Sequence, residues 1–152
     1  MAAVGLLFPG NLGGGVSQVT GFEELDTAAR TVYGEARGEG YDGQRAVAWV
    51  IRNRVENPGW WGDTLESVCH KKWQFSCWLE SDPNRNKLQS VSYEDPDLRR
   101  CLRAVLEVMD SGDDVTNGAT HYLVSTLDPK PDWYSDDKVI CRIGHHAFLK
   151  DV

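Results

Sequence analysis

The sequence predicts a single α+β domain that is mainly helical and carries a small antiparallel β ribbon. Apolar residues recur at helical spacing over 22–35, 43–56 and 96–110. Two later segments, 119–125 and 138–149, are instead typical of strands. Helices first and strands last favour an α+β arrangement over an alternating one. A chain of 152 residues is long enough to bury one core of its own.

Local signals mark the ends of the predicted helices. Asp42 is placed to cap the helix over 43–56, and Thr64 to cap a short helix that runs to residue 70. The third long helix begins at Pro96, directly after Asp95, and Gly112 stops it.

Two segments carry no such periodicity. Residues 73–92 are expected to form a long loop, and long loops in compact domains are usually functional. Residues 1–21 are rich in Gly and small apolar residues and contain no Lys or Arg. We expect a flexible or extended arm there, followed by one catalytic domain over 22–152. The arm lacks the positive start and long apolar run of a secretory signal.

The charge balance excludes some partners. The formal net charge is −7, and nucleic-acid binding needs clustered Lys and Arg. No apolar run approaches the roughly 18 residues that indicate a membrane span. We therefore expect neither nucleic-acid binding nor stable membrane insertion.

The segment 33–40 (Tyr-Gly-Glu-Ala-Arg-Gly-Glu-Gly) holds the strongest chemical signal. It places Glu35 and Glu39 among glycines at the end of a helix, just before another helix begins. A carboxyl partly buried in a cleft between helices has a raised pKa and can serve as a general acid. The structural alternative is a solvated helix end with scattered charges.

Here the chain resembles a known family, the SleB/CwlJ-type cell wall hydrolases. The resemblance rests on five blocks that cover most of the chain: 33–40, 42–55, 73–78, 118–122 and 143–148. It implies peptidoglycan cleavage on a lysozyme-like scaffold of the goose-type lytic transglycosylase kind. It also implies that Glu35 is the catalytic acid.

Glu39 has two readings. In a goose-type transglycosylase the sugar's own 6-hydroxyl attacks C1, so Glu39 would only support the site. Its structural alternative is an ion pair with Arg37 or Arg45, or a negative charge at the N-terminus of the second helix. In a muramidase-type hydrolase, Glu39 would be the second carboxylate beside Glu35.

Aromatic and polar side chains further along are expected to bind the glycan. Gln74 and Ser76 are expected to bind polar sugar groups, while Trp78 is a candidate wall of the acid's pocket together with Tyr33 and Trp49. By the resemblance, Tyr122 lies near Glu35, with His121 beside it. Strand alternation predicts that only one of these two faces the cleft.

Metal and thiol chemistry are weaker alternatives. His145 and His146 are adjacent, so in a strand they face opposite ways, and no metal-ligand spacing is present. We therefore expect no metal and no cofactor, and we rank a zinc amidase low. The four cysteines allow two bridges or four thiols, and a Cys–His peptidase or amidase remains a further rival: Cys69, Cys77, Cys101 and Cys141.

We therefore expect a monomeric enzyme that cleaves the β-1,4 bond between N-acetylmuramic acid and N-acetylglucosamine, as a lytic transglycosylase in which Glu35 is both acid and base. The alternatives are a muramidase, an amidase or a non-catalytic wall-binding module. Without a signal peptide or wall-binding module, the expected setting is a phage lysin, made in the cytoplasm and acting on the cell wall after release.

Overall fold

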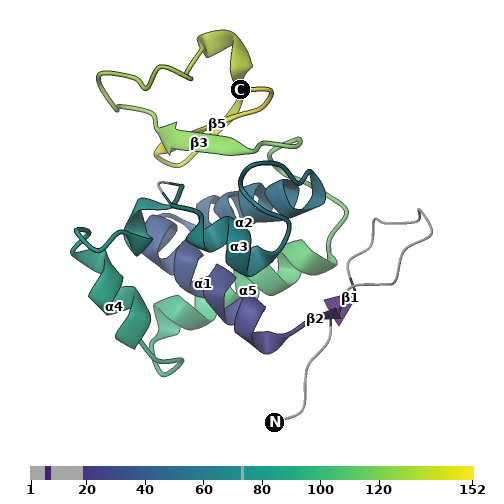
Figure 1. Ribbon diagram of the computed structural model, residues 1–152, viewed down its shortest axis with the longest axis vertical. Helices are drawn as coiled ribbons and strands as arrows, with labels where there is room; N and C mark the ends of the chain where they lie inside the picture. The colour runs from purple at the N-terminus through teal and green to yellow at the C-terminus, as the bar shows by residue number, and fades with distance from the viewer. Residues whose placement is uncertain (1–5, 8–18, 73) are drawn as a thin grey trace.

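The computed structural model of the protein describes residues 6–7, 19–72 and 74–152. A helical body lies below a small sheet, and the chain enters the sheet only after its last helix (Figure 1). The α+β prediction is confirmed. The α-helices are α1 Phe22–Ala36, α2 Tyr41–Glu56, α3 Leu65–His70, α4 Asn84–Ser90 and α5 Pro96–Asp110. None of these helices is both long and apolar enough to cross a membrane.

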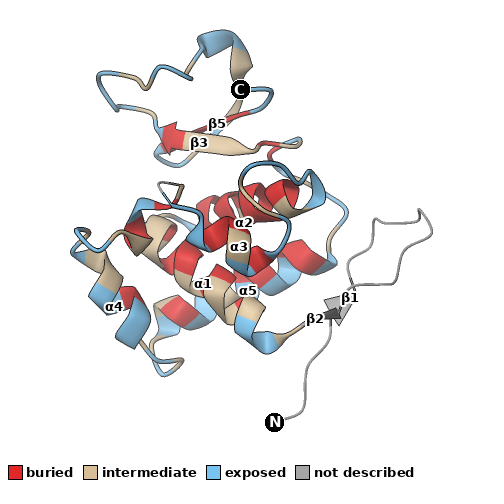
Figure 2. Ribbon diagram, in the orientation of Figure 1, coloured by how far each residue is buried: buried red, intermediate tan, exposed pale blue. Residues whose placement is uncertain are grey.

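The three long helices pack against one another and enclose most of the core (Figure 2). On α1, Leu25, Ala29 and Val32 follow helical spacing, and each is at most 1% exposed. α2 is buried over most of its length because α1, α3 and α5 all contact it. Such a helix lies at the centre of the domain, so its polar side chains need partners inside the protein.

The cap signals were partly right. Thr64 caps α3 through the Ser67 backbone N–H, and Asp95 caps α5 through two backbone N–H groups. Asp42, in contrast, does not cap α2: the helix begins at Tyr41, with Gly40 at the cap position. Asp42 lies in the first turn, where its charge still favours the positive end of the helix dipole.

The predicted loop over 73–92 is wrong in part. It contains the short 3-10 helix η1 Ser76–Trp78 and the helix α4. α4 covers the end of α1 by burying Leu88 there. One buried side chain in seven residues gives too weak a period to recognise in the sequence.

The predicted single strand over 138–149 is two strands. β4 Val139–Ile143 and β5 His146–Leu149 form a hairpin, and β3 His121–Val124 pairs with the other edge of β5. All pairings are antiparallel, and a short 3-10 helix, η2 Asp136–Lys138, precedes β4. Gly144 makes the hairpin turn with φ +57°, a conformation that glycine adopts without strain.

Little of the predicted arm over 1–21 is described. The two described pieces, β1 Leu6–Leu7 and β2 Val19–Thr20, pair antiparallel. Residues 1–5 and 8–18 lie outside the described residues, so the flexible or extended arm stays a prediction, as does the boundary at residue 22.

Candidate active site

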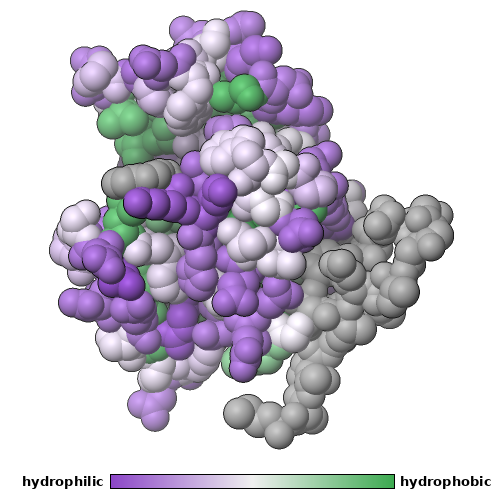
Figure 3. All heavy atoms as spheres, in the orientation of Figure 1, coloured by the Kyte–Doolittle hydropathy of each residue, from purple (hydrophilic) through white to green (hydrophobic). Residues whose placement is uncertain are grey.

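A cleft of about 450 Å³ lies where the sheet meets the helical body. Five of the seven predicted site residues line it: Glu35, Gln74, Ser76, His121 and Tyr122. Apolar side chains gather along this boundary in the space-filling view (Figure 3), and Val124 and Leu127 are exposed at the cleft. A cleft lined by polar, apolar and aromatic side chains together suits a sugar chain.

Glu35 lies in the last turn of α1, and two other segments approach its carboxylate. The backbone N–H of Cys77, in η1, donates a hydrogen bond to Glu35 Oε1 at 3.3 Å. From β3, Tyr122 lines the same cleft, and its hydroxyl interacts electrostatically with Glu35. Burial, followed by the interaction with Glu35, raises the pKa of Tyr122 well above its usual value. Tyr122 therefore remains a neutral donor at neutral pH.

Gly34 makes this approach possible. A Cβ on Gly34 would lie 2.7 Å from Cys77 Cβ and 2.9 Å from Leu88 Cδ2. Only a residue without a side chain lets η1 pack so closely against α1. The glycine beside Glu35 therefore makes room for the loop that holds the acid.

Arg54, which the sequence analysis did not single out, links the loop to the sheet. Its side chain is buried; Nε donates to the Thr120 carbonyl at 2.7 Å and Nη1 donates to Gln74 Oε1 at 3.2 Å. The guanidinium also lies over the rings of Trp61 and Phe75. Gln74 is thereby fixed at the cleft. The available signal was a charged residue late in a predicted core helix.

His121 and Tyr122 both line the cleft, so the expectation that only one would do so is wrong. Their rings do point to different surroundings, as alternation requires. Tyr122 packs on Phe75, whereas His121 packs between Trp61 and Trp133. The cleft extends past β3 to Trp133, so it takes in both faces of the strand.

Glu39 does not line the cleft but lies against the β4–β5 turn. Its side chain is 9% exposed, and its Oε1 lies 3.2 Å from His145 Nδ1 and 3.4 Å from His146 Nδ1. Neither Arg37 nor Arg45 pairs with it among the described contacts. The two histidines reach one carboxylate because His145 lies in the turn, where strand alternation does not apply.

His146 is a cleft residue that the sequence analysis weighed only as a metal ligand. It lines the cleft with Glu35, and its ring stands edge-on to Tyr122 with centroids 5.1 Å apart. Burial lowers the pKa of His146, while Glu39 and Glu35 act in the opposite direction. The ring is therefore neutral at neutral pH.

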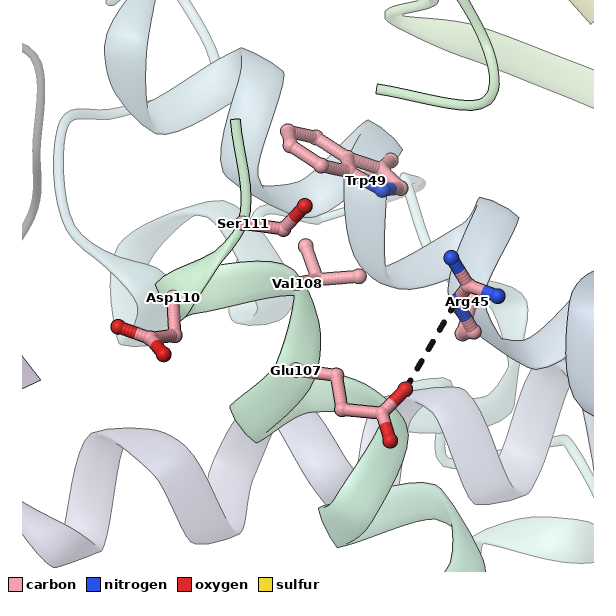
Figure 4. A pocket seen from close by; sticks show the side chains of 6 residues that line it. All are labelled: Arg45, Trp49, Glu107, Val108, Asp110 and Ser111. Atoms are coloured by element: carbon pink, nitrogen blue, oxygen red, sulfur yellow. Dashed lines mark ion pairs between the residues drawn. The ribbon is translucent and has the colours of Figure 1, made fainter. Parts of the chain in front are cut away.

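The remaining aromatic candidates lie elsewhere. Trp78 is outside the set that lines the cleft; its Nε1 donates to Thr31 and its ring meets His70. Tyr33 is in the core, 1% exposed. Trp49 lines a different pocket, between α2 and α5, beside the Arg45–Glu107 ion pair (Figure 4).

Thiol chemistry finds no support at this site. All four cysteines are free thiols, so no bridge fixes the loop. Burial raises the pKa of Cys69 to about 12, and burial together with Glu35 raises that of Cys77. Thiols that stay protonated at neutral pH are poor nucleophiles. Among the described residues, no three His, Cys, Asp or Glu side chains gather to hold a metal ion.

The helical body and the small sheet form a lysozyme-like α+β fold. The Glu35 carboxyl lies between them, hydrogen-bonded by the Cys77 backbone N–H. The chain belongs to the Cell Wall Hydrolase family, whose pattern it matches over residues 38–149.

Relatives and solved structures agree with this assignment. A spore cortex-lytic enzyme of Halalkalibacterium halodurans is 35% identical over 130 residues, covering 82% of this chain. The corresponding enzyme of Bacillus subtilis is 30% identical over 140 residues. The chain spans 34% and 40% of the lengths of these two relatives.

Two solved structures superpose on most of the chain. The catalytic domain of the Bacillus cereus SleB protein has a TM-score of 0.73 at 29% identity and covers 91% of this chain and 100% of that one. The catalytic domain of the germination-specific lytic transglycosylase SleB from Bacillus anthracis has a TM-score of 0.69 at 30% identity, covering 89% and 100%.

Proposed function

We propose that this protein is a peptidoglycan lytic transglycosylase that cleaves the β-1,4 bond between N-acetylmuramic acid and N-acetylglucosamine. The observation that carries the proposal is Glu35: among the described residues that line the cleft it supplies the one carboxyl side chain, which accepts a hydrogen bond from the Cys77 backbone N–H and lies beside Tyr122. The similarity to a germination-specific lytic transglycosylase supports the same reaction.

Glu35 would protonate the glycosidic oxygen as the bond to C1 breaks. In the simplest cycle the 6-hydroxyl of the same muramic acid then attacks C1, and Glu35 takes its proton. That hydroxyl belongs to the sugar itself, so its effective concentration far exceeds that of a loosely held water. The product is a 1,6-anhydro sugar end.

The muramidase alternative needs a second carboxylate in the cleft. Glu39 contacts His145 and His146 and is not among the residues that line the cleft. This placement favours a supporting role for Glu39. An amidase or a non-catalytic wall-binding module would leave the held carboxyl of Glu35 without a use.

Mass spectrometry of digested peptidoglycan tests the proposal. Anhydro ends make each fragment about 18 Da lighter than its hydrolysed counterpart, since the two differ by one water. We expect the lighter series. Fragments that carry only reducing muramic acid ends would leave a muramidase, and release of stem peptides from intact glycan would leave an amidase.

The cell wall is the proposed place of action, and the protein is proposed to act as a monomer with the glycan strand as its partner. Its release from the cytoplasm as a phage lysin remains a prediction. Sedimentation of the purified protein tests the monomeric state. Lysis of cells that express it together with a pore-forming protein tests its action as a phage lysin.

A further inference from the structure

We infer that His146 is a second catalytic residue: oriented by Glu39 at its Nδ1, it accepts at Nε2 the proton of the hydroxyl that attacks the sugar, while Glu35 protonates the leaving oxygen. This inference rests on the proposed function and deepens it. It divides between two residues the acid and base roles that the simplest cycle assigns to Glu35 in turn.

The position of His146 is the first support. Its side chain is 8% exposed, yet it lines the same cleft as Glu35 and Tyr122. Its Nδ1 lies 3.4 Å from Glu39 Oε1, and the described side chains and backbone groups make no hydrogen bond to Nε2, the other ring nitrogen. A buried imidazole on a cleft wall, with a ring nitrogen that no described group hydrogen-bonds, is placed to meet a ligand.

Glu39 supplies the second support. A carboxylate at Nδ1 keeps the proton there and leaves Nε2 as an acceptor, which is the tautomer a general base needs. The His146–Glu39 contact is 3.4 Å, within ion-pair distance but not in hydrogen-bond geometry. Such contacts often become shorter and better aligned only when substrate binds.

The turn before β5 is built to keep this pair together. The His145 backbone N–H donates to Glu39 at 3.3 Å. A Cβ on Gly144 would overlap the Glu39 carboxylate, so a larger residue would push it away. Glu39 is therefore a positioning residue, placed by the turn and acting through His146.

The protonation state also fits. Four titratable groups surround the imidazole: Glu39 from the α1–α2 connection, Glu35 from α1, His145 from the turn and Tyr122 from β3. Burial lowers the pKa of His146 most, His145 lowers it further, and the two carboxylates raise it. Tyr122 is neutral at the pH values concerned. The net result is a ring that is neutral near pH 7 and able to accept a proton.

The step balances as follows. The C1–O4 bond breaks as Glu35 gives its proton to O4, and the O6–C1 bond forms as the 6-hydroxyl gives its proton to His146. The imidazolium then loses that proton to solvent, and Glu35 regains one from solvent. If the attacking group is instead a water, the same residue would accept its proton.

The test compares His146→Gln, Glu39→Gln and His70→Gln in the full chain, with thermal unfolding as the fold check. His70 is an exposed histidine that does not line the cleft, so the same substitution there is the matched control. We expect His146→Gln to lower kcat by about 10²–10⁴-fold, the usual range for a lost general base, and to remove the fall in rate at acid pH. Glu39→Gln should lower kcat less, and His70→Gln should match wild type.

A folded His146→Gln variant with wild-type kcat and an unchanged acid limb would overturn the inference. If that variant does not fold, NMR titration of the His146 imidazole in the wild-type protein and in Glu39→Gln tests the inference instead. A parallel acid shift of the imidazole titration and of the acid limb supports the pair; no shift in either overturns it. Glu35→Gln distinguishes a failure of the proposed function from a failure of the His146 role. Full activity in Glu35→Gln would overturn the proposed function itself.

Discussion

Cys77 donates its backbone N–H to the Glu35 carboxylate over 3.3 Å, joining η1 to the last turn of α1. Tyr122, on β3, lines the same cleft and interacts electrostatically with this carboxylate. Three segments far apart in the chain thus converge on one carboxyl. Its position depends on the packing of the whole domain and not on α1 alone.

Glu35→Gln should keep the fold and lower wall lysis by at least ~100-fold, because the amide cannot donate the proton that the leaving oxygen needs. The measurement is the lysis rate of cells stripped of their outer membrane, with circular dichroism to confirm the fold. Lysis at the wild-type rate would remove Glu35 from its assigned role.

Gly34→Ala should destabilise the protein by about 1–3 kcal/mol, the usual cost of overpacking, because the new Cβ overlaps Cys77 and Leu88. Gly38→Ala is the matched control, since a Cβ there meets nothing within 4 Å. Its effect should stay within about 0.5 kcal/mol. Urea unfolding of both variants measures the difference. Equal stabilities would show that η1 does not pack on Gly34 as described.

Trp60 and Trp133 should bind glycan beyond the cleaved bond. They are 58% and 40% exposed and end a row of rings that runs through Trp61 and His121, with centroids 5.3–6.0 Å apart. Replacing either indole by Ala should raise KM about three- to tenfold with little change in kcat, since each stack contributes about 0.5–1.5 kcal/mol.

Leu106→Ala is the control for these two variants. Leu106 is a comparably exposed apolar residue on α5, outside the residues that line the cleft. We expect no change in KM on soluble glycan. An equal rise in all three variants would indicate a loss of general surface adhesion instead of a sugar site.

His121 should make stability depend on acid. Burial, with a smaller contribution from Arg54, lowers the pKa of His121 to about 4. The unfolded chain therefore binds a proton near pH 6.5 that the folded chain refuses, and stability falls as pH drops from about 6.5 towards 4. The urea midpoint is measured at pH 7 and at pH 5. Its decrease between these two pH values should be smaller in His121→Gln than in wild type. Parallel losses would contradict a half-buried His121 ring whose pKa is lowered.

Chelation should leave lysis unchanged. The described residues bring no three potential metal ligands together, and the sequence has no paired ligand spacing. The assay is lysis before and after EDTA treatment, with zinc added back. Activity that is lost on EDTA treatment and restored by zinc would instead support a zinc-dependent amidase.

The sequence by itself determined the elements whose signals are local. The helical spacing of Leu25, Ala29 and Val32 places α1 and brings Glu35 to its end. Thr64 and the Asp95–Pro96 pair mark two helix starts correctly, because a cap and its partner N–H lie within three residues. The motif around Glu35 also identified the family.

Only the tertiary structure decided which side chains surround Glu35. Three features depend on contacts between distant segments. Glu39 lies beside His146, Gly34 leaves space for Cys77, and Trp49 lines a different pocket from Glu35. Such contacts are set by how whole faces of helices and strands pack, and no short window of sequence contains both partners. The weakly periodic α4 and the turn at Gly144 were missed for the same reason: their neighbours in space define them.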